Sequence, residues 1–367
     1  MSAFERKRVF ILGAGFSKPS KMPDAAELTD LLLDVEFMRA DQQFQQWVSS
    51  LRERINHLHQ LDHPGEENRI SIEQVFEFAA FDIEWCLLQQ QEATATVGET
   101  WGARGRSIKK RLAVMERILF EVLIDAQEKH SLGAAPLVNF ADALRVSDAV
   151  LTFNYDTLLE RALAARRKKW SSGFDVEPGG DVTVLKLHGS LDWLICHRDK
   201  TIGSVLFEIN PGSIEWHEVE EEQRHHWEKN FVLSRTPDLA AARAAARWDP
   251  LLETNKSPWP GLAGLGPHKP LHRVIGSCVV WRKALHALRE ADEIYVIGWS
   301  ASPYDTMARF HFASVLNLRE TRPRRVVIVD PKVCEQIKSY RSIFGDVEPI
   351  AQCAERVDWD SLLGRLQ

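Results

Sequence analysis

The chain has 367 residues, 44% of them apolar, which suffices for one large domain with insertions or for two domains. Its formal net charge of −6 argues against nucleic acid as a direct partner, although a local basic patch would survive that average. No apolar run is long enough to span a bilayer. The five cysteines are scattered without a CxxC pair, and no signal peptide is evident. We therefore expect a cytoplasmic protein without a zinc site.

The first stretch of interest runs from Val9 to Asp24. Four apolar residues, 9–12, lead into the glycine-rich sequence GAGFS at 13–17, which predicts a buried parallel strand and a tight turn. Glycines in such a turn let the backbone approach a pyrophosphate. Pro23 and Asp24 then predict the start of a helix. The third glycine of the dehydrogenase fingerprint is absent, so a turn without a ligand stays open as the alternative.

The next segment, from residue 37 to 130, is predicted to be mostly helical. Apolar residues recur at steps of three and four over 44–61, 70–91 and 109–129, with Ser71 as an N-cap. Residues 61–69 and the glycine-containing patch 98–105 are predicted as loops. We interpret 37–144 as a helical subdomain inserted into an α/β domain that is formed by 1–36 and 145–367.

In the remainder of the chain, predicted strands alternate with predicted helices. Strands are predicted at 149–153, 182–187, 293–297, 325–329 and around Ile350, and helices at 154–167, 278–291, 303–316 and from Asp358. This alternation predicts a Rossmann-like parallel sheet covered by helices on both faces, with the large helical insertion after its first strand. The charged run 166–169 is explained by a helix dipole. Residues 196–275 are less regular, with a strand at 205–209, a charged helix at 218–228 and a long loop at 248–270.

Four of the predicted strands end in small or polar residues. They lead into GAGFS, TFNYD at 152–156, LHGS at 187–190 and GWSAS at 298–302. The carboxyl ends of parallel strands meet at one edge of a sheet, and ligands of such sheets bind there. The four segments therefore predict one ligand site.

In this order, the four segments resemble the motifs of the sirtuins. The resemblance is closer still to the sirtuin-like domain of bacterial antiphage systems, in which the second motif reads T-x-N-Y-D. There the late strand follows a spaced pattern that is matched here by Trp281, Ala284, Leu288, Ala291 and Asp292. The resemblance covers both ends and the middle of the chain, but not the helical insertion or residues 196–275.

The resemblance implies a Rossmann-like domain that uses NAD+. Sirtuin deacylases carry a four-cysteine zinc ribbon after the His-Gly motif. The four cysteines that follow His188 in this chain are widely spaced and form no CxxC pair. We therefore expect NAD+ as the substrate, no metal, and cleavage of the nicotinamide–ribose bond rather than removal of acyl groups from lysine.

The resemblance also implies roles for particular residues. His188 would be a general base, for which an imidazole is suited near neutral pH, and a core histidine is the alternative. Asn154 would orient water or the ribose hydroxyls, or cap a helix. Asp156 would contact the nicotinamide carboxamide, or compensate a helix dipole, and Asp305 would cap a helix or touch the adenosine ribose. The other residues predicted to contact the dinucleotide are Gly13, Ala14, Gly15, Phe16, Ser17, Asp24, Thr152, Tyr155, Gly189, Ser190, Gly298, Trp299 and Ser300.

The leading hypothesis is an NAD+ hydrolase that acts as the effector of antiphage defence. Because loss of NAD+ kills the cell, such an enzyme must be held inactive. We therefore expect a homo-oligomer or a separate regulatory partner, such as the HerA-type ATPase of some systems in the family. The alternatives are a non-catalytic module that senses NAD+ or ADP-ribose and regulates a partner, and an ADP-ribosyltransferase. Deacylation ranks last.

Overall fold

A computed structural model describes residues 6–33, 42–62, 70–92, 95–129, 135–174, 182–197, 201, 203–208, 231–246, 259–262, 277–302 and 305–363. The chain forms two compact units. The first, here called the α/β unit, comprises Met1–Met22, Leu123–Ala263 and Pro270–Gln367. The second, the helical unit, comprises Pro23–Val122 and Gly264–Lys269. The domain boundaries expected from the sequence stay predictions, because compact packing does not by itself delimit a domain.

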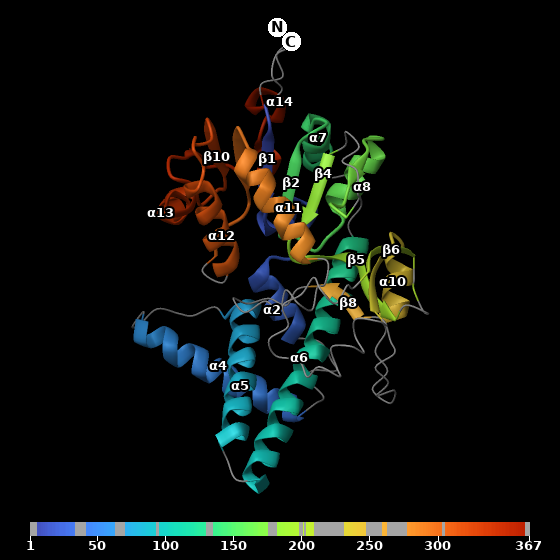
Figure 1. The fold of residues 1–367 in the computed structure, drawn as a ribbon, viewed down its shortest axis with the longest axis vertical. Coiled ribbons are helices and arrows are strands. Elements are labelled where there is room, and N and C mark those ends of the chain that lie inside the picture. Colours follow the sequence, from blue (N-terminus) through green and yellow to red (C-terminus); the bar gives the residue numbers. More distant parts are fainter. Residues whose placement is uncertain are drawn as a thin grey trace. The chain divides into compact units, whose positions relative to one another are not determined.

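A seven-stranded parallel sheet forms the centre of the α/β unit (Figure 1). Its order is β11-β10-β9-β1-β2-β4-β3, and every neighbouring pair is parallel. The strands are β1 Arg8–Leu12, β2 Ala149–Thr152, β3 Trp170–Ser171, β4 Val182–Lys186, β9 Glu293–Ile297, β10 Arg325–Val329 and β11 Glu348–Ile350. The predicted Rossmann-like sheet is confirmed.

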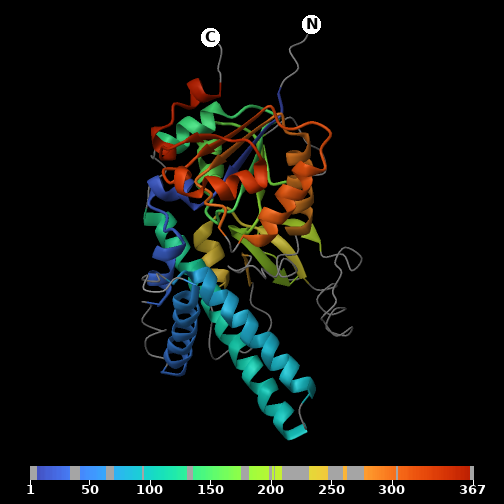
Figure 2. The same ribbon diagram turned by 90° about the vertical axis from the view of Figure 1, so that its left-hand side faces the viewer.

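Helices cover both faces of this sheet because its central strands are apolar on both sides. Val9 and Ile11 of β1 belong to one core with α11 (Ser277–Glu290), α12 (Thr306–Asn317) and α13 (Val333–Phe344). Phe10 points to the other face, where its ring lies 5.4 Å from that of Phe140 in α7 (Ala135–Ala143). In Figure 2, α11 and α12 in orange and α7 in green lie on opposite sides of the strands.

The order of the strands identifies the edge at which a ligand would bind. From β1 the chain first builds one side of the sheet through β2 and β4, and then returns to β9 on the other side of β1. This reversal between β1 and β9 is a topological switch point, where the crevice outside the strand ends binds ligands in open α/β sheets.

A second, four-stranded antiparallel sheet lies within the irregular part of the sequence. Its order is β6-β7-β5-β8, with β5 Gly189–His197, β6 Ser204–Glu208, β7 Phe231–Arg235 and β8 Trp259–Leu262. The strand predicted at 205–209 is confirmed as β6. The loop predicted at 248–270 is wrong at β8, which pairs with β5 although it contains Pro260. Proline is tolerated there because β8 is an edge strand. The helix predicted at 218–228 lies outside the described residues.

Short elements complete the α/β unit. They are α1 Ala14–Ser17, a 3-10 turn Lys18–Ser20, α8 Leu158–Ala165, α10 Leu239–Ala246, a 3-10 turn Ala354–Arg356 and α14 Trp359–Leu362. The predicted closing helix is confirmed as α14, and Asp358 caps it by accepting a hydrogen bond from the Ser361 amide.

The helical unit contains α2 Ala25–Leu33, α4 Gln42–Asp62, α5 Ile72–Glu92 and most of α6 Ala95–Lys129. Ser71 caps α5 as predicted, through reciprocal hydrogen bonds with Gln74. The loop predicted at 98–105 is wrong, because α6 runs through it. A Cβ at Gly102 would lie 3.0 Å from the side chain of Gln90, and one at Gly105 would lie 3.3 Å from that of Cys86. The glycines therefore let α6 pack closely against α5 instead of ending the helix.

Within the described part of the chain, no helix is both long enough and apolar enough to cross a membrane.

Candidate functional site

Two glycine-containing loops meet at the carboxyl ends of β1 and β9. The amide of Gly13 donates to the carbonyl of Ile297 at 3.1 Å, and that of Gly15 to the carbonyl of Gly298 at 2.9 Å. A Cβ at Gly13 would lie 2.5 Å from the Cα of Trp299, and one at Gly15 would lie 2.9 Å from the Cα of Gly298. The glycines at 13 and 15 are therefore required for backbone-to-backbone packing at the switch point.

Asn154 joins this loop from β2. Its Nδ2 donates to the carbonyl of Gly13 and to the hydroxyl of Ser17, both at 2.9 Å, and its amide donates to Thr152 Oγ1 at 3.1 Å. The side chain is half-buried. The helix predicted from Asn154 begins only at Leu158, so the alternative reading of Asn154 as its cap is wrong. The structure thus brings four of the predicted site residues into one hydrogen-bonded cluster.

His188 stands beyond the end of the neighbouring strand. Thr152 pairs with Lys186 in the sheet, so Asn154 and His188 each follow that pair by two residues. The imidazole is buried, with ring centroids 4.9 Å from Phe153 and 6.1 Å from Tyr155. Its Nε2 lies 3.8 Å from Asp305 Oδ1. Aromatic rings and a carboxylate thus surround this histidine.

Asp305 does not act as a helix cap through its side chain, which was one of the two roles expected from the sequence. It is the N-cap residue, directly before Thr306 of α12, but its side chain makes no capping hydrogen bond. Oδ2 instead accepts a hydrogen bond of 2.8 Å from the indole of Trp299. The Trp299 ring stacks on Phe153 at 5.0 Å, and its carbonyl accepts from the Tyr340 hydroxyl at 2.7 Å.

Asp156 closes the turn that precedes α8. Its Oδ1 accepts a hydrogen bond from the Leu158 amide at 3.1 Å, and its carbonyl accepts one from the ammonium of Lys186. Lys186 is buried and also lies 3.3 Å from Glu160. Burial raises the pKa of Glu160, and Lys186 opposes that effect.

Sequence reasoning missed Lys186 as a residue of this site. Its ammonium connects the end of β4 to the loop that carries Asn154. The available signal was a cation at the end of the otherwise apolar strand VTVLK, since a buried charge needs a partner.

The other predicted residues are placed as follows. Phe16 and Ser190 are buried, whereas Ala14, Gly15 and Ser300 are exposed. Gly189 has a φ of 87° and begins β5. Asp24 belongs to the helical unit, where it forms a capping box with Glu27 at the start of α2. The roles of these residues in binding a dinucleotide stay predictions.

Among the described residues, no group of three or more His, Cys, Asp or Glu side chains is arranged to hold a metal ion.

Comparison with known proteins gives one family. The family described as the SIR2-like domain matches residues 148–207, a segment that contains Asn154 and His188. Among curated proteins, none matches this chain.

Solved structures with a similar path include a Sir2 homologue in complex with NAD, at 16% identity over 98% of this chain and 89% of that chain, with a TM-score of 0.42. Another is a structure reported on the mechanism and regulation of Sir2 enzymes. It has 15% identity over 99% of this chain and 95% of that chain, with a TM-score of 0.43. With TM-scores this low, the similarity to these structures is not used as evidence. The assignment of a SIR2-like domain rests on the family match and on the order of the strands.

Proposed function

Starting from a chain that contains a sirtuin-like domain, we propose that the protein hydrolyses NAD+ to nicotinamide and ADP-ribose, as the effector of a bacterial antiphage defence system. One observation carries the proposal. The 60-residue match to the SIR2-like domain, 148–207, includes both strand ends that hold Asn154 and His188. The glycine loop that Asn154 contacts lies at the switch point of the sheet.

The proposed reaction needs only side chains at this edge. The bond between ribose C1′ and the pyridinium nitrogen breaks, and its electron pair neutralises the nicotinamide ring. A water oxygen then bonds to C1′ and its proton passes to His188. The hydrogen bonds described for the Asn154 side chain all use Nδ2. Its carbonyl Oδ1 would therefore orient the water or a ribose hydroxyl. The developing positive charge on the ribose is stabilised by such nearby polar groups.

The same proposal includes control of the activity. An enzyme that consumes NAD+ in a living cell must be inactive until it is needed. We propose that oligomerisation, or a separate partner such as a HerA-type ATPase, supplies this control.

The decisive experiment is a nicotinamide-release assay on purified protein at several protein concentrations, with its oligomeric state measured by mass photometry. We expect release of nicotinamide that depends on assembly or on a partner. His188→Ala and Asn154→Asp should each lower kcat at least a hundredfold, about 3 kcal/mol, without unfolding the protein. Full activity in both variants would remove the site assignment. Constitutive activity of a monomer would contradict the proposed control.

A non-catalytic module that senses NAD+ or ADP-ribose is the second candidate. The observation that favours it is the burial of His188, which is only 5% exposed. Tight binding of NAD+ by calorimetry, without nicotinamide release in the presence of the partner, would support this candidate over the hydrolase.

A further inference from the structure

The carboxylate of Asp305 faces inward at a position where it would normally cap a helix. An aspartate at a helix N-cap usually accepts a hydrogen bond from the first-turn amides. Asp305 makes no such bond with its side chain and is only 7% exposed. A buried carboxylate is costly unless it is paired, and this one is paired with the Trp299 indole and the His188 imidazole.

One carboxylate oxygen of Asp305 faces Trp299 and the other faces His188. Oδ2 accepts from Trp299 Nε1 at 2.8 Å, which fixes the carboxylate, and Oδ1 then lies 3.8 Å from His188 Nε2. That separation is longer than a hydrogen bond and makes an ion pair only when the imidazole is protonated, but catalytic contacts of this kind shorten when the substrate complex forms. A carboxylate facing Nε2 favours the neutral tautomer with its hydrogen on that atom, which leaves the lone pair on Nδ1.

Trp299 is itself held firmly. Its ring stacks on Phe153, which also contacts the His188 ring, and its carbonyl accepts from Tyr340. It follows Gly298, whose backbone packs against Gly15 of the glycine loop. The orientation of the imidazole is therefore tied to the two loops at the switch point.

We propose that Asp305 is a positioning residue, which Trp299 holds so that its carboxylate fixes the ring orientation and tautomer of His188. This rests on the proposed function for its catalytic meaning. The arrangement has the logic of a catalytic triad, in which a carboxylate orients the histidine that accepts the proton.

Kinetics of nicotinamide release test the catalytic part. Asp305→Asn should lower kcat at least tenfold and leave KM within about twofold, because the substrate still binds while the base is misoriented. Trp299→Phe keeps a ring but removes the N–H, and should lower kcat in the same way by a smaller factor. The double variant should be no slower than Asp305→Asn alone, because Trp299 acts through Asp305. Effects that multiply, or that raise KM alone, would overturn the proposal.

Nitrogen NMR of the histidine rings tests the positioning without any activity. Protein labelled with 15N-histidine is measured at a pH of about 8, above the reference pKa of an imidazole, about 6.5. The His188 signals are identified by their loss in His188→Gln. We expect signals of a single tautomer in the unmodified protein and an altered tautomer balance in Asp305→Asn. Asp330→Asn, at the end of β10, is the matched control and should leave these signals unchanged.

The two readouts separate the two hypotheses. If the protein releases no nicotinamide, the proposed function fails, whereas the ring spectra still decide whether Asp305 orients His188. Identical His188 signals in the unmodified protein and in Asp305→Asn would overturn the positioning role even in an active enzyme.

Discussion

At the scale of single residues, Gly298 is a position where the site tolerates little change. It has a φ of 60°, in the left-handed region that favours glycine, and a Cβ there would lie 2.5 Å from the carbonyl carbon of Gly15. That neighbour is backbone and cannot move aside without displacing the glycine loop. Gly345 has a similar φ of 78°, but a Cβ there would meet only the end of the Arg322 side chain, at 3.0 Å.

We therefore predict that Gly298→Ala destabilises the protein by more than about 3 kcal/mol, because strain in the left-handed region adds to a backbone clash. Gly345→Ala has the strain without the clash and should cost about 1 kcal/mol. Thermal or chemical unfolding of the two variants measures the difference. Equal losses of stability would show that the two loops can separate without a penalty.

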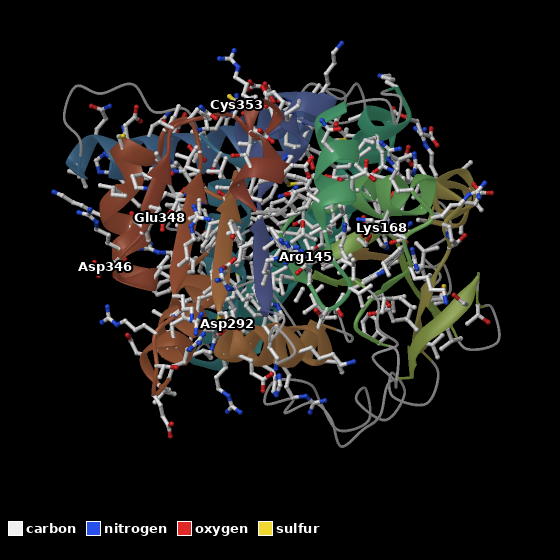
Figure 3. The ribbon with its side chains drawn as sticks, turned by 90° about the horizontal axis from the view of Figure 1, so that it is seen from above. Arg145, Lys168, Asp292, Asp346, Glu348 and Cys353 are labelled. Atoms are coloured by element: carbon white, nitrogen blue, oxygen red, sulfur yellow. The ribbon has the colours of Figure 1, made fainter. Side chains whose placement is uncertain are left out.

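At the scale of elements, the cation run after α8 stabilises a different helix. The sequence explains 166–169 by the dipole of the helix that precedes it, yet the ammonium of Lys168 donates to carbonyls at the end of α7. Its bonds to Ala141, Asp142 and Leu144 measure 2.7, 2.6 and 2.7 Å. Lys168 is one of the labelled side chains in Figure 3. A cation near the C-terminal carbonyls of a helix is favourable even when it belongs to another part of the chain.

Replacing Lys168 by Met should lower the free energy of unfolding by about 2 kcal/mol, because three carbonyls lose a charged donor while the apolar stem is kept. Lys169→Met, one residue along on an exposed side chain, should change it by less than about 0.5 kcal/mol. The measurement is the unfolding midpoint of each variant in urea. A similar loss of unfolding free energy in both variants would mean that the hydrogen bonds of Lys168 add nothing to stability beyond the effect of its charge.

At the scale of the whole α/β unit, an ionic cluster that is buried except for the half-buried Arg235 lies where the parallel sheet continues into the antiparallel one. Lys186 of β4 pairs with Glu160 of α8 at 3.3 Å, and Arg235 of β7 pairs with Asp192 of β5 at 2.6 Å. Burial raises the pKa of Glu160. Lys186 lowers it, and Asp192 adds to the rise by repulsion. Folded protein thus holds the Glu160 proton more tightly than unfolded chain.

The sign of the pH effect follows from that difference. Below the unfolded pKa of Glu160, about 4.5, both states carry the proton and burial brings no penalty. As pH rises above that value toward the raised folded pKa, the unfolded chain ionises first and the folded state loses stability. We predict that the unfolding temperature of the unmodified protein, relative to Glu160→Gln, falls as pH increases from about 4.5. The exposed Glu355→Gln is the control and should show no such trend. A constant difference across this range would contradict the assignment.

Most of the α/β architecture follows from local pattern. Apolar runs such as EIYVI and RVVIV are buried on both faces, so they predicted parallel strands that became β9 and β10. The ends of four strands predicted one ligand edge, and Asn154 does bond Gly13 and Ser17 there. The antiparallel sheet could not be predicted in the same way, because β8 reads as a Pro- and Gly-containing loop until β5 pairs with it.

The sequence alone determined the strands, their alternation with helices and the edge where small and polar residues gather, because those features depend on the periodicity of neighbouring residues. The tertiary structure decided which partner each polar group takes. Asp305 accepts a hydrogen bond from Trp299 instead of capping α12. Lys168 donates to carbonyls at the end of α7, and Lys186 donates to the carbonyl of Asp156. Such choices depend on which elements approach one another in space, and spacing along the chain does not fix them.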